Sequence, residues 1–221
     1  MKFRILIFFL FSYQVAIAQN DTIGYFENHK DIGNPKLAGS AIYDKVTHSY
    51  KIKGGGYNIW FNRDEFHYAY KKVTGDFIAT ANFEFMGDEG NGHRKTGWML
   101  RQSLADDDVH ISAESHGDGL TVLQWRSKKG QNMKDPEEEI FYPERATFGV
   151  IQLQRTGKKV TMRIGHVGEP LKTVGAHEMP NIKDPVYLGI YICSHDPEKL
   201  EEARVWDVHI DKPANKTASK K

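Results

Sequence analysis

The feature that most constrains the fold is a strict two-residue alternation of side chains over residues 76–85. One set of alternate positions holds Phe77, Ala79, Ala81, Phe83 and Phe85, and the other holds Ile78, Thr80, Asn82 and Glu84. Successive side chains of a β-strand point to opposite faces of the sheet, so this pattern predicts a strand with one face in a core.

Shorter runs of the same kind follow one another along most of the chain. They cover residues 49–53, 57–61, 66–73, 96–102, 109–116, 120–127, 147–155, 159–166, 172–177, 186–193 and 203–210. Gly-rich or acidic breaks separate them, and the one helix expected is short, over residues 197–203 with Asp196 as its N-cap. Many short strands with no long amphipathic helix between them predict an all-β fold, an antiparallel two-sheet β-sandwich.

The two ends differ in composition from the middle of the chain. Residues 1–18 have the pattern of a signal peptide: Lys2 and Arg4 precede an apolar stretch, and Ala16-Ile17-Ala18 forms a cleavage site. We expect residues 19–39 to lead into the sandwich, residues 40–211 to form it, and the Lys-rich residues 212–221 to be a disordered tail. The protein would then be exported, either periplasmic or extracellular, with no membrane insertion after cleavage of the signal.

Charge and cysteine content limit the classes of partner and chemistry. The formal net charge is +1, and loss of the two positive charges of the predicted signal would make it about −1. A near-neutral chain lacks the basic surface that nucleic-acid binding requires, so we expect no nucleic-acid partner. Cys193 is the only cysteine, which excludes an intrachain disulfide, and its apolar surroundings predict a core residue.

Several short motifs along the chain resemble one known family. They are Gly-Ser-Ala-x-Tyr-Asp at 39–44, Gly-Gly-Gly-Tyr-Asn-Ile-Trp at 54–60, Thr-Gly-Asp-Phe at 74–77, Gly-Trp-Met-Leu-Arg-Gln-Ser-Leu at 97–104 and Gln-Trp-Arg at 124–126. The chain is similar, over about residues 24–212, to concanavalin A-like jelly-roll domains of largely unknown function that are described as regulation-of-enolase-like. The resemblance is strongest to exported single-domain proteins of Bacteroidota that carry TolB/TolR-like biopolymer transport labels. It implies a jelly roll that binds or processes glycans, and it carries over no catalytic residue.

Polar side chains on the central predicted strands form the first candidate site. If Leu123 and Trp125 point into the core, Gln124 and Arg126 point to the opposite face, beside Arg101. Guanidinium and amide groups can donate paired hydrogen bonds to hydroxyls, carboxylates or sulfates. The alternative is a solvated sheet face with ordinary ion pairs.

Aromatic side chains are concentrated between residues 57 and 70. Sugar rings stack on flat aromatic side chains, but aromatic residues at strand spacing also form cores. Phe66 and Trp98 are better explained as core residues, whereas Trp60 lies at a turn beside Asn62-Arg63-Asp64 and is a candidate ligand contact.

Two kinds of catalysis remain as alternatives. Glycoside hydrolysis needs a pair of carboxylates, for which only Asp64, Glu84 and Glu114 on separate strands are candidates. A polysaccharide lyase would need a group to neutralise a uronate and a His or Tyr as base and acid. Arg101, Gln124, Arg126, His67, His116 and Tyr68 supply those residue types.

Metal binding has weaker support in the sequence. His110 and His116 would be about 20 Å apart along one strand, too far for one tetrahedral site. The oxygen-rich loops at 88–92 and 105–108 have a composition that could hold Ca²⁺. We expect no cofactor, with Ca²⁺ as the alternative.

The function that fits these observations best is recognition of a polysaccharide or oligosaccharide without catalysis. The residues expected to contact it on the concave sheet and its rim are Trp60, Asp64, His67, Arg101, His116, Gln124, Arg126 and His195. A polysaccharide lyase or hydrolase is the first alternative, and a structural or protein-binding component of the cell envelope is the second. The oligomeric state is left open.

Overall fold

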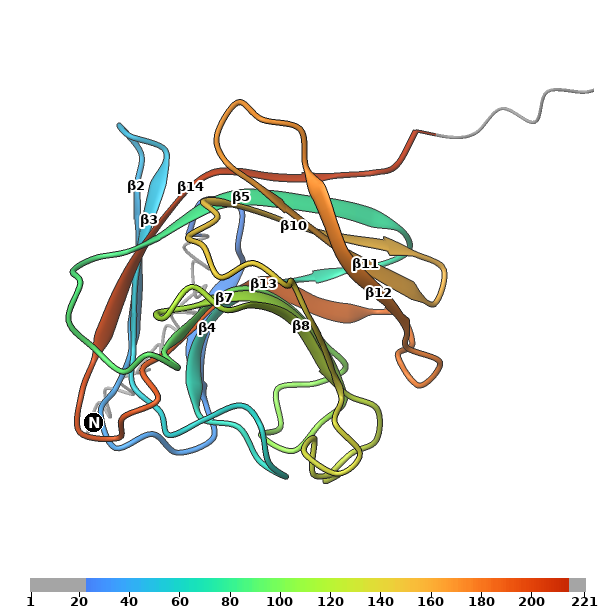
Figure 1. Ribbon diagram of the computed structural model, residues 1–221, viewed down its shortest axis with the longest axis horizontal. Coiled ribbons are helices and arrows are strands. Elements are labelled where there is room, and N and C mark those ends of the chain that lie inside the picture. Colours follow the sequence, from blue (N-terminus) through green and yellow to red (C-terminus); the bar gives the residue numbers. More distant parts are fainter. Residues whose placement is uncertain (1–22, 215–221) are drawn as a thin grey trace, which may run out of the picture.

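The computed structural model describes residues 23–214 and shows two antiparallel sheets packed face to face (Figure 1). One sheet, called the curved sheet below, arches over a group of loops. Its strands, in spatial order, are β1 (Asn28–Ile32), β4 (Phe66–Val73), β13 (Val186–Cys193), β6 (Lys95–Arg101), β7 (His110–His116), β8 (Thr121–Arg126) and β9 (Glu139–Phe141). The predicted all-β sandwich is therefore confirmed.

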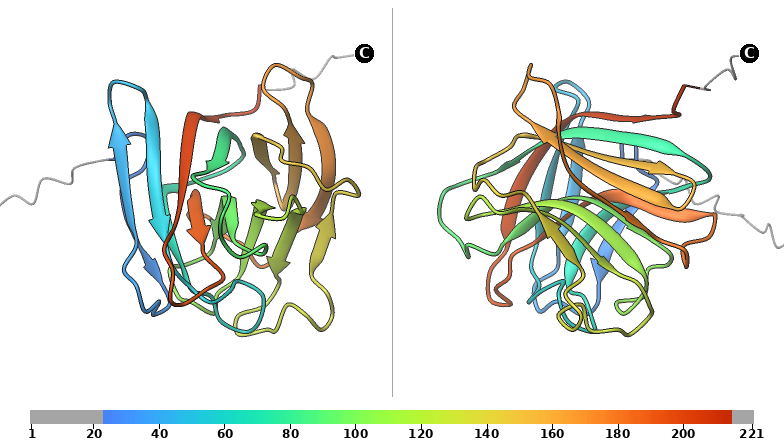
Figure 2. Two further views of the ribbon diagram at one scale, coloured as in Figure 1. Left: turned by 60° about the vertical axis from the view of Figure 1, so that its left-hand side comes forward. Right: turned by 45° about the vertical axis from the view of Figure 1, so that its right-hand side comes forward.

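The second sheet, called the outer sheet, also has seven strands. Their spatial order is β12 (Lys172–Glu178), β11 (Lys159–Gly165), β10 (Val150–Thr156), β5 (Phe77–Phe85), β14 (Glu201–Asp211), β3 (Ser49–Gly54) and β2 (Ser40–Asp44). The right-hand view of Figure 2 shows the outer sheet as a separate layer above the curved one. Strands adjacent in the sequence are often in different sheets, which is typical of jelly rolls.

The main core lies between the two sheets and follows the predicted alternation. The curved sheet contributes side chains such as Trp98, Leu100 and Leu123, and the outer sheet contributes Ala79 and Phe83. All five are buried, because the apolar face of each sheet is removed from water only when the two faces pack together.

A second apolar cluster lies on the opposite, concave face of the curved sheet. Its buried members are Ile32, Ile59, Phe66, Tyr68, Tyr70, Met99, Tyr191 and Cys193. Most belong to the sheet, but Ile59 belongs to residues 55–65, which we call the covering segment. This segment and the loops after β6 and β8 lie on the side of the curved sheet that faces away from the outer sheet (Figure 1).

Two local expectations are wrong. Residues 57–61 do not form a strand: only an isolated bridge joins Ile59 to Asp64. Residues 197–203 do not form a helix, because β14 begins at Glu201 after a turn. In both places tertiary packing overrides local sequence preference.

The structure describes only part of the segments that were predicted at the two ends of the chain. β1 lies within the predicted leading segment 19–39 and pairs with β4 at the edge of the curved sheet. The signal-peptide prediction for residues 1–18, and residues 215–221 of the predicted tail, lie outside the described residues. Between residues 23 and 214 there is no helix that is long and apolar enough to cross a membrane.

Candidate functional site

Strand register brings a set of polar side chains together on the concave face of the curved sheet. On β6, Lys95 and Arg101 share this face; on β7, residues 110, 112, 114 and 116 share it, and on β8, Gln124 and Arg126 do. Lys95 pairs with His116 across the first two strands, and Arg101 pairs with His110. Leu123 and Trp125 point into the main core, as predicted.

The residues at one end of this face form a sealed charge cluster, which we define as Asp64, Arg101, His110 and Arg126. Nη1 and Nη2 of Arg126 donate to the two carboxylate oxygens of Asp64 at 2.8 and 2.6 Å, and Nη1 of Arg101 donates to Oδ2 at 2.8 Å. Nδ1 of His110 lies 3.6 Å from the same oxygen. All four side chains have no exposed surface.

The other donors of the two guanidinium groups also bind protein atoms. Arg101 donates to the carbonyl oxygens of Ser103 and Ala105, and Arg126 donates to those of Phe61 and Gln131. Gln124, 1% exposed, donates to the carbonyl oxygen of Ile59 at 2.8 Å.

The expectation of an open groove at Arg101, Gln124 and Arg126 is therefore wrong. The side chains point to the predicted face, but the covering segment closes over them and supplies Asp64, which was expected at an exposed rim. Fully buried donors with protein acceptors have nothing left to offer a ligand. The candidate site is accordingly built without these four residues.

His67 is also separated from the other predicted residues. It lies on the core-facing side of β4, where its Nδ1 contacts Asp31 Oδ1 at 2.6 Å and its Nε2 contacts His29 Nδ1 at 2.9 Å. Its expected place on the binding rim is wrong because Phe66 and Tyr68 occupy the concave face of the same strand.

The remaining three predicted residues, Trp60, His116 and His195, line one cavity of about 290 Å³. It lies at the end of the curved sheet opposite the charge cluster. The complete lining is Asn58, Trp60, His93, Lys95, His116, Leu120, Glu139 and His195. Asn58 and Trp60 come from the covering segment, Lys95, His116 and Glu139 from strands, and the others from loops, so we call this space the Trp60 cavity.

A hydrogen-bonded chain fixes His116 in the wall of the Trp60 cavity. Its Nε2 lies 3.2 Å from Oε1 of Glu114, and the hydroxyl of Tyr191 donates to the other oxygen of that carboxylate. Donation to a carboxylate places the imidazole proton on Nε2 and leaves Nδ1 as a hydrogen-bond acceptor. The chain therefore orients His116 and sets its tautomer.

Burial keeps the imidazoles of His116 and His195 neutral near pH 7. Desolvation lowers the pKa of His116, an effect that Glu114 opposes and Lys95 reinforces. Desolvation, followed by repulsion from Lys95, lowers the pKa of His195 to about 4. The ring of His93 lies 5.8 Å from that of His116 and 5.3 Å from that of His195, between centroids.

Two polar atoms in this wall stand out because they lack a protein partner. The Nδ1 atoms of His116 and His195 are buried and accept or donate no hydrogen bond within residues 23–214. Buried polar atoms nearly always have a hydrogen-bond partner. Two such atoms without a partner, in residues that line one cavity, therefore indicate a place where a ligand could bind. The described residues contain no group of three His, Cys, Asp or Glu side chains arranged to hold a metal ion.

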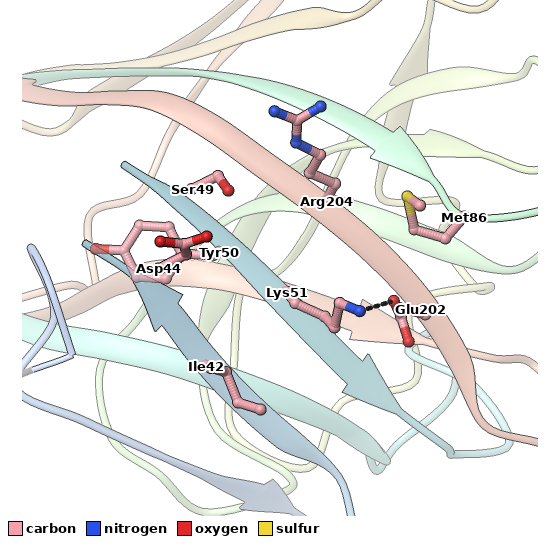
Figure 3. A pocket seen from close by; sticks show the side chains of 8 residues that line it. All are labelled: Ile42, Asp44, Ser49, Tyr50, Lys51, Met86, Glu202 and Arg204. Atoms are coloured by element: carbon pink, nitrogen blue, oxygen red, sulfur yellow. Dashed lines mark ion pairs between the residues drawn. The ribbon is translucent and has the colours of Figure 1, made fainter. Parts of the chain in front are cut away.

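A larger hollow, of about 390 Å³, lies on the exposed face of the outer sheet (Figure 3). It is lined by residues of β2, β3 and β14, and its lysine, Lys51, is paired with Glu202 at 3.2 Å. None of its described side chains has a buried polar atom without a partner. The Trp60 cavity is therefore the better candidate for a binding site.

Sequence reasoning missed Asn58, His93, Lys95 and Glu139. A signal for Lys95 was present: the alternation that links Arg101 to Met99 and Gly97 reaches Lys95 when it is extended by one more step. Asn58 and His93 lie in loops whose course no periodic pattern sets, and Glu139 lies in a strand of only three residues. These three depended on tertiary structure.

Fold and site together define a concanavalin A-like jelly-roll sandwich with a cavity lined by Trp60, His116 and His195 at one end of its curved sheet. Solved structures share the fold at low sequence identity. A functionally unknown protein from Saccharomyces cerevisiae aligns with a TM-score of 0.60 and 12% identity, over 84% of this chain and 96% of that one.

Two further structures have names that refer to carbohydrates. A β-1,3-1,4-glucanase (lichenase) from a mouse hindgut metagenome aligns with a TM-score of 0.54 and 8% identity, over 87% of this chain and 97% of that one. A legume lectin-like domain from Entamoeba histolytica gives 0.51 and 13%, over 84% and 89%. No protein-family model and no curated protein sequence matches the chain, so the narrower relation to exported Bacteroidota proteins stays a prediction.

Proposed function

We propose that this protein is an exported saccharide-binding protein whose ligand occupies the Trp60 cavity. The observation that carries the proposal is that His116 and His195 each have a buried imidazole nitrogen without a partner. Both residues line the same cavity as Trp60. An indole ring can stack on the C–H face of a sugar, while imidazole, amide and ammonium groups bond to hydroxyls. The cavity is at the lower end of the usual size of ligand pockets, which suits one sugar unit or the end of a chain.

The fold supports the same proposal by analogy. The lectin-like domain and the lichenase named above share this sandwich, and their names refer to carbohydrate binding and to cleavage of a glucan. Fold similarity alone does not assign a function, so the argument depends on the cavity.

The test compares Trp60 with its neighbour Phe61. Trp60→Ala is expected to weaken saccharide binding by roughly 30-fold, or about 2 kcal/mol, because it removes a stacking surface. Phe61→Ala is the matched control: Phe61 is an aromatic of the same segment, 37% exposed, and does not line the cavity. Affinity electrophoresis against neutral and anionic polysaccharides, followed by calorimetry, measures both. The proposal fails if the wild-type protein binds no saccharide, or if the two variants behave alike.

One observation favours an enzyme as a second candidate. The Glu114–His116 pair has the arrangement of an oriented general base, and His116 lines a cavity that could hold a sugar. Incubation with polysaccharides would separate the two functions. New reducing ends without ultraviolet absorbance from a conjugated double bond would indicate hydrolysis, and new reducing ends with that absorbance would indicate elimination. If the wild-type protein forms such a product and the folded His116→Gln variant does not, the protein is an enzyme and the proposal of binding without catalysis is wrong.

A further inference from the structure

Lys95 is a buried cation without a counter-ion. Its side chain is 3% exposed, and its Nζ donates to Oδ1 of Asn58 at 3.3 Å and to the carbonyl oxygen of His93 at 3.1 Å. Both acceptors are uncharged, and Lys95 forms no ion pair within residues 23–214. An ammonium has three donors, so one remains unused in the wall of the Trp60 cavity.

The other buried cations of the curved sheet differ from Lys95 in this respect. Arg101 and Arg126 share the carboxylate of Asp64, and Arg94 is paired with Glu201 at 2.7 Å. A buried charge is costly unless an opposite charge accompanies it. Within residues 23–214, Lys95 is therefore the buried cation of this face that contacts no carboxylate, and it lines the cavity.

We propose that the saccharide bound in the Trp60 cavity carries an anionic group, a carboxylate or a sulfate ester, that pairs with the ammonium of Lys95. The inference rests on the proposed function and deepens it by naming the ligand class. The anion would complete the coordination of Nζ, while the sugar ring contacts Trp60 and its hydroxyls bond to the nitrogens of His116 and His195.

The charged and titratable neighbours of this position predict how pH affects anion binding. They are Glu114 and His116 on β7, Glu139 on β9, Cys193 on β13, His93 before β6 and His195 after β13. Glu139 is the competing anion in the lining, and burial together with the charges of Glu137 and Glu114 raises its pKa. As pH falls toward the raised pKa of Glu139, this residue loses its charge before the ligand does. Anion binding should therefore strengthen from about pH 7.5 to about pH 5.

The experiment measures dissociation constants by calorimetry for three sets of probes. They are uronate oligosaccharides (mannuronate, guluronate and galacturonate), the same oligosaccharides with carboxyl groups reduced, and sulfated galactan oligosaccharides. We expect one anionic set to bind at least roughly 10-fold more tightly than the neutral set, and the set that does so identifies the anion. Lys95→Gln should weaken that binding by roughly 30-fold or more and abolish the preference.

Glu139→Gln provides a second test of anion binding, at a residue that is less buried than Lys95. It should tighten anion binding several-fold near pH 7.5 and remove most of the strengthening at lower pH. If Lys95→Gln does not fold, this variant decides the question. Lys51→Gln, in the hollow on the outer sheet, is the matched control and should leave all constants unchanged.

Two negative results have different meanings. In the first, neutral and anionic saccharides bind equally, Trp60→Ala abolishes the binding of each, and neither Lys95→Gln nor Glu139→Gln changes the ratio of their dissociation constants. The anionic ligand is then refuted, and saccharide binding stands. If no probe binds, both proposals are refuted.

Discussion

At the scale of single residues, Asp64 has the largest structural role that the sequence did not reveal. Its carboxylate contacts both Arg101 and Arg126, and all three side chains are fully buried. The two guanidinium groups carry more positive charge than Asp64 balances, and their remaining donors bind the carbonyl oxygens of Ser103, Ala105, Phe61 and Gln131. Removing one partner of such a group leaves uncompensated charge in the interior.

Asp64→Asn is therefore expected to lower the free energy of unfolding by about 3–5 kcal/mol. Urea unfolding followed by fluorescence measures this change. The matched control is Glu198→Gln, which removes an ion pair with Lys36 in which both side chains are more than half exposed. Exposed pairs contribute about 1 kcal/mol or less, so equal effects of the two variants would contradict this account of Asp64.

At the scale of elements, the covering segment 55–65 determines which polar residues are accessible. Among the hydrogen bonds that hold it, Gln124 donates to Ile59 O, Met133 N donates to Trp60 O, and Asp64 N donates to Asp106 O. Its C-terminal end therefore supplies Asp64 to the charge cluster, and its middle supplies Asn58 and Trp60 to the lining of the Trp60 cavity.

Gly56 sets the path of this segment. Its φ is +116°, and a Cβ there would lie 2.0 Å from the carbonyl oxygen of Glu65. Gly56→Ala should cost about 3 kcal/mol or more, since it adds a clash to backbone strain. Gly75→Ala is the control: its φ is +79° with open space around the position, so only strain of about 1–2 kcal/mol applies. Thermal unfolding of the two variants tests the difference, and an equal loss would show that the contact with Glu65 is unimportant.

The alternation of side chains predicted most strands of this fold, but not β1, β2 or β9, and it predicted the face on which each central residue lies. Arg101, Gln124 and Arg126 are on the predicted face, and Leu123 and Trp125 are in the core. The period of a strand contains no information about what covers the sheet, because a loop is positioned by contacts distant in sequence. Trp60, His116 and His195 were predicted as ligand contacts and do meet in one cavity, whereas the closure of the charge cluster depended on the path of the covering segment.

At the scale of the whole molecule, buried imidazoles make the stability of the fold depend on pH. Desolvation lowers the pKa of His110 to about 3, although Asp64 acts in the opposite direction. In the unfolded chain a histidine binds a proton near pH 6.5. Below that pH the unfolded state takes up protons that the folded state does not, so stability is complete above pH 6.5 and is lost toward pH 3.

The free energy of unfolding should therefore fall between about pH 7 and about pH 4.5, with His110 contributing up to about 3 kcal/mol. His110→Gln removes the titrating group and should flatten this dependence. His209→Gln, at an exposed position of β14, should keep the wild-type slope. Urea titrations at a series of pH values measure the slopes, and a His110→Gln slope equal to that of the wild type would contradict the prediction.

Because Trp60 and Asp64 belong to one segment, occupancy of the cavity and integrity of the charge cluster are thermodynamically reciprocal. A molecule held beneath Trp60 must make residues 55–65 harder to detach, and weakening the attachment at Asp64 must loosen the hold on that molecule. Protease digestion of the native protein would reveal this coupling: a bound ligand should slow cleavage within residues 55–65, although Asp64, which attaches this segment, lies outside the cavity.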